Sequence, residues 1–121
     1  MRLSSWLLAA LSVSIVASAG AAPGYYREPT LRGDTVVFVA EGDLWRVAAS
    51  GGRAQRLTTH PALGSQPVLS ADGREVAFVA SYDGEPDVYV MPLAGGQPRR
   101  LTFDASRVWL SGYTPQGEIA Y

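Results

Sequence analysis

Residues 43–58 read DLWRVAASGGRAQRLT, and residues 87–102 read DVYVMPLAGGQPRRLT. The two stretches are copies of one pattern. An Asp, a Gly-Gly pair and a final Arg-Leu-Thr recur in register, 44 positions apart. An internal repeat with a period of about 40–45 residues is typical of architectures in which one small supersecondary unit is stacked several times.

The repeat extends beyond these two stretches. VVFVA at residues 36–40 matches VAFVA at residues 76–80, and a longer loop at residues 81–86 accounts for the change in spacing. TPQGEIAY at residues 114–121 aligns with SADGREVAF at residues 70–78 after one deletion. Pro-Thr-Leu and Pro-Val-Leu, starting at Pro29 and Pro67, mark the beginnings of the first two units.

Each unit predicts four short strands. The runs 36–39, 76–79, 44–47 and 88–91 are rich in β-branched and aromatic residues, as strands prefer. Gly-Gly pairs at 51–52 and 95–96 permit the positive φ angles of tight hairpins. No stretch after Pro23 shows a sustained helical apolar period.

These units predict an all-β fold, a partial β-propeller of two four-stranded blades and the start of a third. The blades span about residues 25–58, 66–102 and 107–121. A closed propeller has at least four blades, so we expect the chain to be incomplete. A small β-sandwich is the competing fold, but it does not explain why the same residues recur in register.

The first 22 residues have the layout of a secretory signal peptide. A short positive start at Met1–Arg2 precedes an apolar run at 6–16, about half the length of a membrane-spanning helix. Small residues follow, and they predict cleavage after Ala19, or alternatively after Ala22. We therefore expect a periplasmic or secreted protein that has no membrane segment after cleavage.

Composition excludes several kinds of site. The 121 residues carry a net charge of −1, which gives no reason to expect binding to nucleic acid. No cysteine is present, so disulfides, thiolate metal sites and a cysteine nucleophile are ruled out. We expect no catalytic, cofactor-binding or metal-binding residue in this chain, because no nucleophile elbow, phosphate loop or metalloprotease motif occurs.

The blade pattern, SADGxxVAF followed by DVYVMP and GGxxxRLT, resembles the repeat of TolB and tricorn-type propellers. The lead-in GYYRxP at 24–29 and the phrase from Gly33 to Trp45 resemble the start of bacterial tricorn-like serine peptidases. The resemblance implies a non-catalytic propeller that guides peptides to a PDZ-like module and a C-terminal serine peptidase domain. Its partners would be peptides and the rest of its own chain, and the full-length protein could form homo-oligomers. A TolB-like periplasmic protein-binding propeller and the propeller of another hydrolase are the alternatives.

Two candidate sites have explanations that are simpler than catalysis or metal binding. His60 is the only histidine and lies in the link between the first two blades, so we expect a loop residue rather than a catalytic or zinc-binding one. The acidic stretch at 83–87 could bind calcium, but its spacing does not match an EF-hand. We favour a solvated turn.

The remaining candidates repeat between the blades. Asp43 and Asp87 are expected to have a structural role, a hydrogen bond to turn amides or to a neighbouring strand. Arginines at 56, 99 and 100 could hold a peptide carboxylate if they face the central channel, but we favour an outward position. Inter-blade packing is the simplest role for Trp45 and its equivalent Tyr89, and Trp109 has no equivalent.

Overall fold

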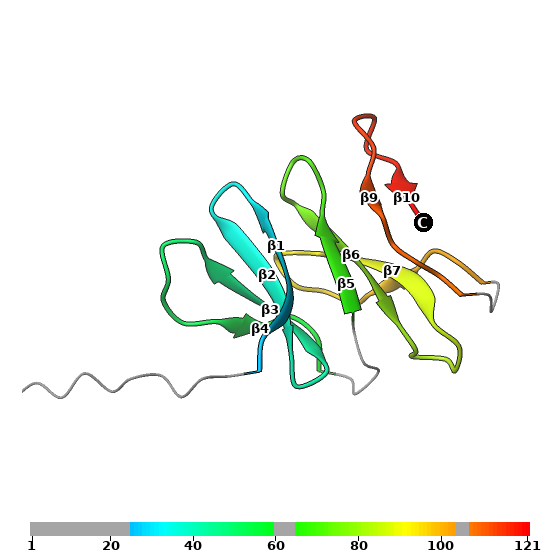
Figure 1. Ribbon diagram of the computed structural model, residues 1–121, viewed down its shortest axis with the longest axis horizontal. Coiled ribbons are helices and arrows are strands. Elements are labelled where there is room, and N and C mark those ends of the chain that lie inside the picture. The colour runs from blue at the N-terminus through cyan, green and yellow to red at the C-terminus, as the bar shows by residue number, and fades with distance from the viewer. Residues whose placement is uncertain (1–24, 60–64, 104–106) are drawn as a thin grey trace, which may run out of the picture.

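A computed structural model describes residues 25–59, 65–103 and 107–121, which form strands joined by turns and loops (Figure 1). The strands of the first blade are β1 (Arg27–Arg32), β2 (Thr35–Ala40), β3 (Asp43–Ala48) and β4 (Gln55–Arg56). Those of the second are β5 (Ser65–Leu69), β6 (Glu75–Ala80), β7 (Asp87–Pro92) and β8 (Arg99–Arg100). The third blade begins with β9 (Gly112–Tyr113) and β10 (Ile119–Ala120).

Both four-stranded sheets are antiparallel meanders in which each strand pairs with the next in sequence. The register is the same in both: Phe38 lies opposite Trp45, and Phe78 lies opposite Tyr89. The hairpin glycines have the positive φ angles that the sequence predicts, for example 117° at Gly52. The predicted all-β fold with partial propeller blades is therefore confirmed.

The first strands of successive blades lie side by side at the inner edge of the assembly. β1 contacts β5, and β5 contacts β9. The short strands β4 and β8 lie at the opposite, outer edges of their sheets. Figure 1 shows the three sheets following one another, with β5 drawn between β1 and β9. This arrangement is that of neighbouring blades around an axis.

Two apolar clusters hold the blades together. In the first, Val37, Val39 and Leu44 of the first blade pack against residues of the second blade that include Phe78 and Tyr89. In the second, three side chains of the second blade pack on the start of the third (Ala77, Val79 and Val88 against Leu110). Because each cluster draws on two blades, the stability of one blade depends on its neighbour.

The inner strands of the two complete blades share an irregularity. The pairing of β1 with β2 shifts between Arg27 and Thr30, and that of β5 with β6 shifts between Ser65 and Val68. At each shift a non-glycine residue has a φ of 51°, Glu28 in one blade and Gln66 in the other. Because the same bulge recurs in both blades, it is a regular feature of the fold rather than a local defect. A bulge of this kind changes the direction in which a side chain points.

The predicted signal peptide at residues 1–22 lies outside the described residues, and so does His60. Across residues 25–59, 65–103 and 107–121, we find no helix with the length and apolar character needed to span a bilayer.

Candidate functional site

The two aspartates of the repeat, Asp43 and Asp87, are buried at the start of β3 and β7. In the second blade the Thr102 hydroxyl donates to Asp87 Oδ1 at 2.7 Å and accepts the N–H of Val88 at 2.9 Å. Arg100 Nη2 donates to the other oxygen of Asp87 at 2.5 Å. One carboxylate therefore joins the third strand of the blade to the segment that ends the fourth.

The first blade contains the same cluster. The Thr58 hydroxyl donates to Asp43 Oδ1 at 2.6 Å and accepts the N–H of Leu44 at 3.0 Å. Arg56 donates to Asp43 Oδ2 from both Nη2 and Nε. The predicted structural role of the two aspartates, as partners of a neighbouring strand, is confirmed. Burying a carboxylate is costly unless it is paired and hydrogen-bonded, and these clusters meet that requirement.

The repeated arginines do not line a channel. Arg56 and Arg100 lie on β4 and β8, the outer strands, whereas the inner edge is formed by β1, β5 and β9. Both guanidinium groups also form ion pairs with buried aspartates. The two arginines are therefore on the outer strands, as expected, but they also neutralise buried carboxylates. Arg99 is exposed on β8.

A cleft of about 370 Å³ lies beside these clusters, between the first and second blades. Its wall includes Thr58 and Thr59 from the first blade and three residues of the second (Tyr82, Asp83 and Tyr89). Tyr82 stands edge-on to Tyr89, with ring centroids 4.8 Å apart. Burial, followed by the negative charge of Asp43, raises the pKa of Tyr82 to about 12. The phenol is therefore neutral at physiological pH and offers no base for catalysis.

The acidic stretch at residues 83–87 does not gather its carboxylates. Asp87 is buried against Thr102 and Arg100, whereas Asp83 lies 3.5 Å from Arg100 Nη1 with a largely exposed side chain, and Glu85 is exposed. Within the part of the chain that the structure describes, no three acidic or histidine side chains come together as metal ligands. The expected solvated turn therefore holds only for the first part of the stretch, because Asp87 is buried at the start of β7. Asp83 and Asp87 both pair with Arg100.

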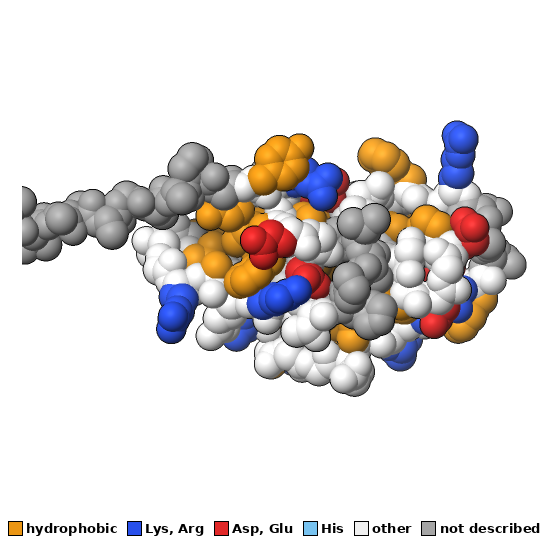
Figure 2. Space-filling model, turned by 90° about the horizontal axis from the view of Figure 1, so that it is seen from below, with side chains coloured by type: hydrophobic (Ala, Val, Ile, Leu, Met, Phe, Trp, Pro, Cys, Tyr) orange, Lys and Arg blue, Asp and Glu red, His pale blue; other side chains and the backbone are white. Residues whose placement is uncertain are grey.

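The aromatic residues of the repeat differ in their surroundings. Tyr89 is buried between the blades and stacks on Phe78, so its predicted packing role is confirmed. Its equivalent Trp45 is half-buried on the face of the first blade that points away from the second blade. There it lines a second cleft with Phe38 and Tyr26. Hydrophobic side chains gather on the surface beside the N-terminal end of the described chain in Figure 2.

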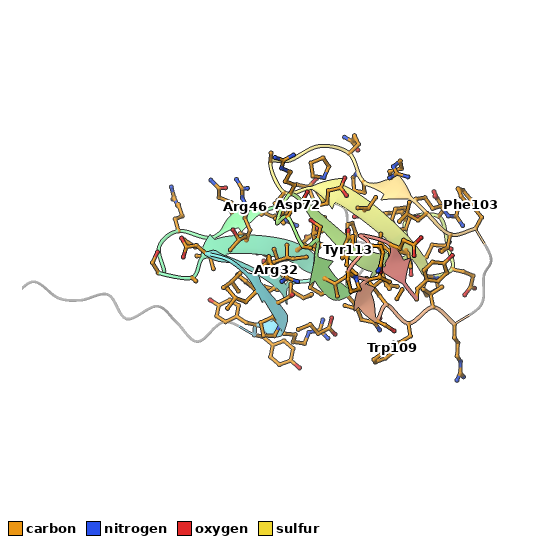
Figure 3. All side chains as sticks on the ribbon, turned by 90° about the horizontal axis from the view of Figure 1, so that it is seen from above. Arg32, Arg46, Asp72, Phe103, Trp109 and Tyr113 are labelled. Carbon is orange, nitrogen blue, oxygen red and sulfur yellow. The ribbon has the colours of Figure 1, made fainter. Side chains whose placement is uncertain are left out.

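A third aromatic group lies at the other end of the molecule. Phe103 and Trp109 are largely exposed and line a hollow together with Tyr121. Figure 3 shows Phe103 at the far end of the second blade and Trp109 pointing away from the sheets.

Comparison with known proteins shows which family has this architecture. The sequence profile described as "Tricorn protease N-terminal beta propeller domain" matches residues 23–121, all of the chain after the predicted signal peptide at residues 1–22. The chain belongs to this family. The predicted resemblance to tricorn-type propellers is thereby confirmed.

Individual relatives and solved structures support the same family assignment. The chain is 40% identical over 100 residues to "Tricorn protease homolog 1" of Streptomyces coelicolor, an alignment that covers 82% of this chain but 9% of that protein. Among solved structures, the crystal structure of the tricorn protease aligns with a TM-score of 0.70 at 21% identity, covering 81% of this chain and 11% of that one. A putative TolB from Agrobacterium tumefaciens aligns with a TM-score of 0.70 at 24% identity, covering 79% and 36%. The chain thus spans about a tenth of the length of these two tricorn proteins.

Sequence reasoning missed two parts of the site. The recurrence of Thr58 and Thr102 was visible in the Arg-Leu-Thr ends, but their pairing with Asp43 and Asp87 requires the register of the third and fourth strands. Tyr82 lies in the loop at 81–86, which replaces the shorter turn at 41–42 of the first unit, so the repeat gave no signal for it.

Proposed function

We propose that this chain is the non-catalytic N-terminal propeller segment of an exported tricorn-like serine peptidase, and that the propeller guides peptide substrates to a catalytic region elsewhere in the longer polypeptide. The family and the fold support the propeller assignment. Peptide degradation and substrate guidance are the functional part of the proposal.

The observation that carries this proposal is the use of the repeated polar residues. Asp43, Asp87, Thr58 and Thr102 are the buried hydroxyl and carboxylate groups that recur between blades. Each is bonded to another member of its own cluster. A nucleophile needs a base and a site open to substrate. In the described residues these groups instead form hydrogen bonds that hold the strands together. Such a use is expected of a segment that supports catalysis carried out elsewhere in the polypeptide.

The experiment compares the longer polypeptide with the 121-residue chain. A fluorophosphonate probe should label a serine in the longer polypeptide and none in the chain of residues 1–121. Removing residues 25–121 should lower kcat/KM for long peptides more than for short ones, because only long peptides need guidance. Labelling within residues 1–121, or equal losses for both peptide lengths, would contradict the proposal.

A TolB-like periplasmic binding propeller is the second candidate. The fold similarity to the putative TolB equals that to the tricorn protease, with a TM-score of 0.70 in both cases. The two candidates differ in the polypeptide that they require beyond residue 121. A polypeptide that completes its blades, resists the serine probe and captures folded protein partners would favour the TolB-like function.

Export is a separate part of the proposal. The apolar run at residues 6–16 and the small residues after it support a cleaved signal peptide. Amino-terminal sequencing of the mature protein should begin at Gly20, or at Pro23 if cleavage follows Ala22. Recovery of intact Met1 in the cytoplasmic fraction would contradict export.

A further inference from the structure

The cleft between the first two blades is lined in part by residues through which the second blade departs from the repeat. Its wall includes Tyr82 and Asp83. Both lie in the loop at residues 81–86, whereas the turn that this loop replaces, at residues 41–42, reads only Glu-Gly. The stacking of repeated units therefore does not account for these two side chains, which makes them candidates for a binding role.

The cleft opens at the outer rim of the two blades. Its wall also includes the segment 57–59, which follows the outermost strand of the first blade, and the segment 96–98, which precedes the outermost strand of the second. None of the described residues that line it belongs to the inner strands β1, β5 and β9. Its volume of about 370 Å³ falls within the range of about 300–1,000 Å³ that is usual for ligand sites. A ligand bound there lies at the side of the blades rather than at their inner edge.

The polar group beside the cleft contains one more carboxylate than it has guanidinium partners. Arg100 serves two aspartates, with Nη2 at 2.5 Å from Asp87 Oδ2 and Nη1 at 3.5 Å from Asp83 Oδ2. In the first blade, Arg56 pairs with Asp43 alone. The two carboxylates and one guanidinium of the second blade leave one negative charge unbalanced within this group. Asp83 carries that charge at the surface, because its side chain is 66% exposed whereas Asp87 is buried.

Asp83 is held only loosely by its own chain. The Tyr89 hydroxyl donates to Asp83 Oδ2 at 3.4 Å, and Arg100 Nη1 donates to the same oxygen at 3.5 Å. Both distances are long for hydrogen bonds. An exposed carboxylate with such contacts keeps the capacity to accept shorter, charge-assisted hydrogen bonds from a ligand.

Two aromatic rings stand beside this carboxylate in the wall of the cleft. Tyr82 and Tyr89 meet edge-on, with ring centroids 4.8 Å apart and an angle of 86° between the ring planes. The face of an aromatic ring attracts a cation, and a guanidinium group can also stack on it. A carboxylate next to such rings has the chemistry that recognises an arginine side chain.

The described residues already contain this form of recognition within the chain itself. Arg56 pairs with Asp43 while its guanidinium carbon lies 5.8 Å from the centroid of the Trp45 ring. In the second blade, Arg100 pairs with Asp87 while it lies 4.9 Å from the centroid of the Phe103 ring. Each arginine thus combines one carboxylate with one aromatic ring. Asp83, with the two tyrosines, offers the same combination to an arginine from outside the described residues.

We propose that the cleft between the first two blades binds an arginine side chain of a peptide substrate. Asp83 accepts hydrogen bonds from the guanidinium group, and the rings of Tyr82 and Tyr89 flank it. The preference for a cation rests on the cleft alone, whereas the peptide as its source rests on the proposed function. This rim site holds arginine-containing peptides at the side of the propeller before they reach the catalytic region.

The test compares two short fluorescent peptides that differ at one position, arginine in one and citrulline in the other. Citrulline has nearly the same shape as arginine but no charge. Binding is measured by fluorescence anisotropy on the full-length polypeptide after treatment with a fluorophosphonate, so that a reactive serine does not consume the peptides. We expect the arginine peptide to bind at least about tenfold more tightly, because the charge-assisted hydrogen bonds are lost with citrulline.

Variants of the loop at 81–86 locate the binding. Asp83→Asn should weaken binding of the arginine peptide at least about fivefold and leave the citrulline peptide unaffected. Glu85→Gln is the matched control, because Glu85 is an exposed acid of the same loop outside the cleft wall, and it should have no effect. Tyr82→Leu, which removes a ring, should also weaken binding, whereas Tyr82→Phe should not. The urea midpoint of each variant shows whether the fold is intact.

Four results bear on the proposal in different ways. Equal affinities for the arginine and citrulline peptides would overturn it, and so would equal losses in Asp83→Asn and Glu85→Gln, which would assign binding to the general charge of the loop. Free agmatine that competes as strongly as the arginine peptide would make the cleft a site for small cations instead of peptides. A full-length polypeptide that no serine probe labels but that keeps the Asp83-dependent preference for arginine would contradict the proposed peptidase function and support this binding site.

Discussion

The Thr58 hydroxyl lies 2.6 Å from Asp43 Oδ1, and 44 residues later Thr102 repeats this contact with Asp87 at 2.7 Å. Each threonine also accepts the N–H of the residue after its aspartate. The contact joins the segment after the outermost strand to the start of the third strand. Since β4 and β8 are only two residues long, the side chains provide connections that a longer strand would obtain from its backbone.

Removing one of these hydroxyls should destabilise the second blade. Thr102→Val keeps the shape of the side chain but leaves the Asp87 carboxylate and the Val88 N–H each short of a partner. We expect a loss of about 2–4 kcal/mol in the free energy of unfolding, since each buried unsatisfied polar group costs about 1–3 kcal/mol. Pulse proteolysis in urea measures this loss. Thr102→Ser, which retains the hydroxyl, should lose far less, and equal losses in both variants would argue against the hydrogen bonds.

The two equivalent phenylalanines should respond differently in the chain of residues 1–121. Phe78→Ala removes a fully buried ring from the cluster between the blades and should cost about 3–5 kcal/mol. Phe38→Ala removes a half-buried ring and should cost clearly less. Urea denaturation of each variant provides the comparison.

A hairpin glycine should resist substitution for conformational reasons alone. Gly52 has a φ of 117°, and a Cβ built there would meet no atom within 4 Å. Gly52→Ala should nevertheless destabilise the first blade by about 1–2 kcal/mol, because an L side chain rarely adopts this conformation. Thermal unfolding measures the effect. Ser50→Ala in the same exposed hairpin is the control and should be nearly neutral; similar losses in the two variants would contradict the backbone explanation.

Alkaline pH should loosen the contact between the first two blades. The pKa of Tyr82 is raised to about 12 by burial and then by the charge of Asp43, whereas an unfolded tyrosine titrates near 10. The folded state therefore favours the neutral phenol. Its contribution is fully present below about pH 10 and is lost as the pH rises towards about 12.

The measurement is the urea midpoint as a function of pH. Tyr82→Phe cannot ionise and should show a smaller alkaline loss, while the exposed control Tyr26→Phe should follow the parent protein. Tyr113, whose pKa burial and the charges of Glu75 and Asp72 also raise to about 12, contributes to the loss that remains. Identical alkaline profiles for Tyr82→Phe and the parent would rule out Tyr82 as a source.

Residues 20–121 expressed alone should self-associate or be poorly soluble. The half-buried face of the first blade around Phe38 and Trp45, and the aromatic hollow around Phe103 and Trp109, leave large apolar side chains at the surface. Exposed apolar faces and strand edges promote association. Light scattering after size-exclusion chromatography tests this, and a monodisperse monomer with one cooperative melting transition would contradict it.

The repeat, the strands and the turns follow from local features of the amino-acid sequence. Runs rich in β-branched and aromatic residues such as 76–79, Gly-Gly hairpins and the recurrence of Asp and Arg-Leu-Thr are local signals, and they predicted the blades and the structural role of the aspartates. Local propensity and short-range turn chemistry can be read from one segment at a time.

The contacts of each repeated side chain depend on how the blades pack together. Tyr89 and Trp45 occupy the same position in the repeat, yet one is buried against a neighbouring blade and the other is half-exposed. Arg56 and Arg100 could have faced a channel or solvent until the sheet order placed them on the outer strands, beside buried aspartates. The physical reason is that burial and pairing depend on which blade stands next to which, and stacking is a property of the assembled sheets rather than of any one repeat.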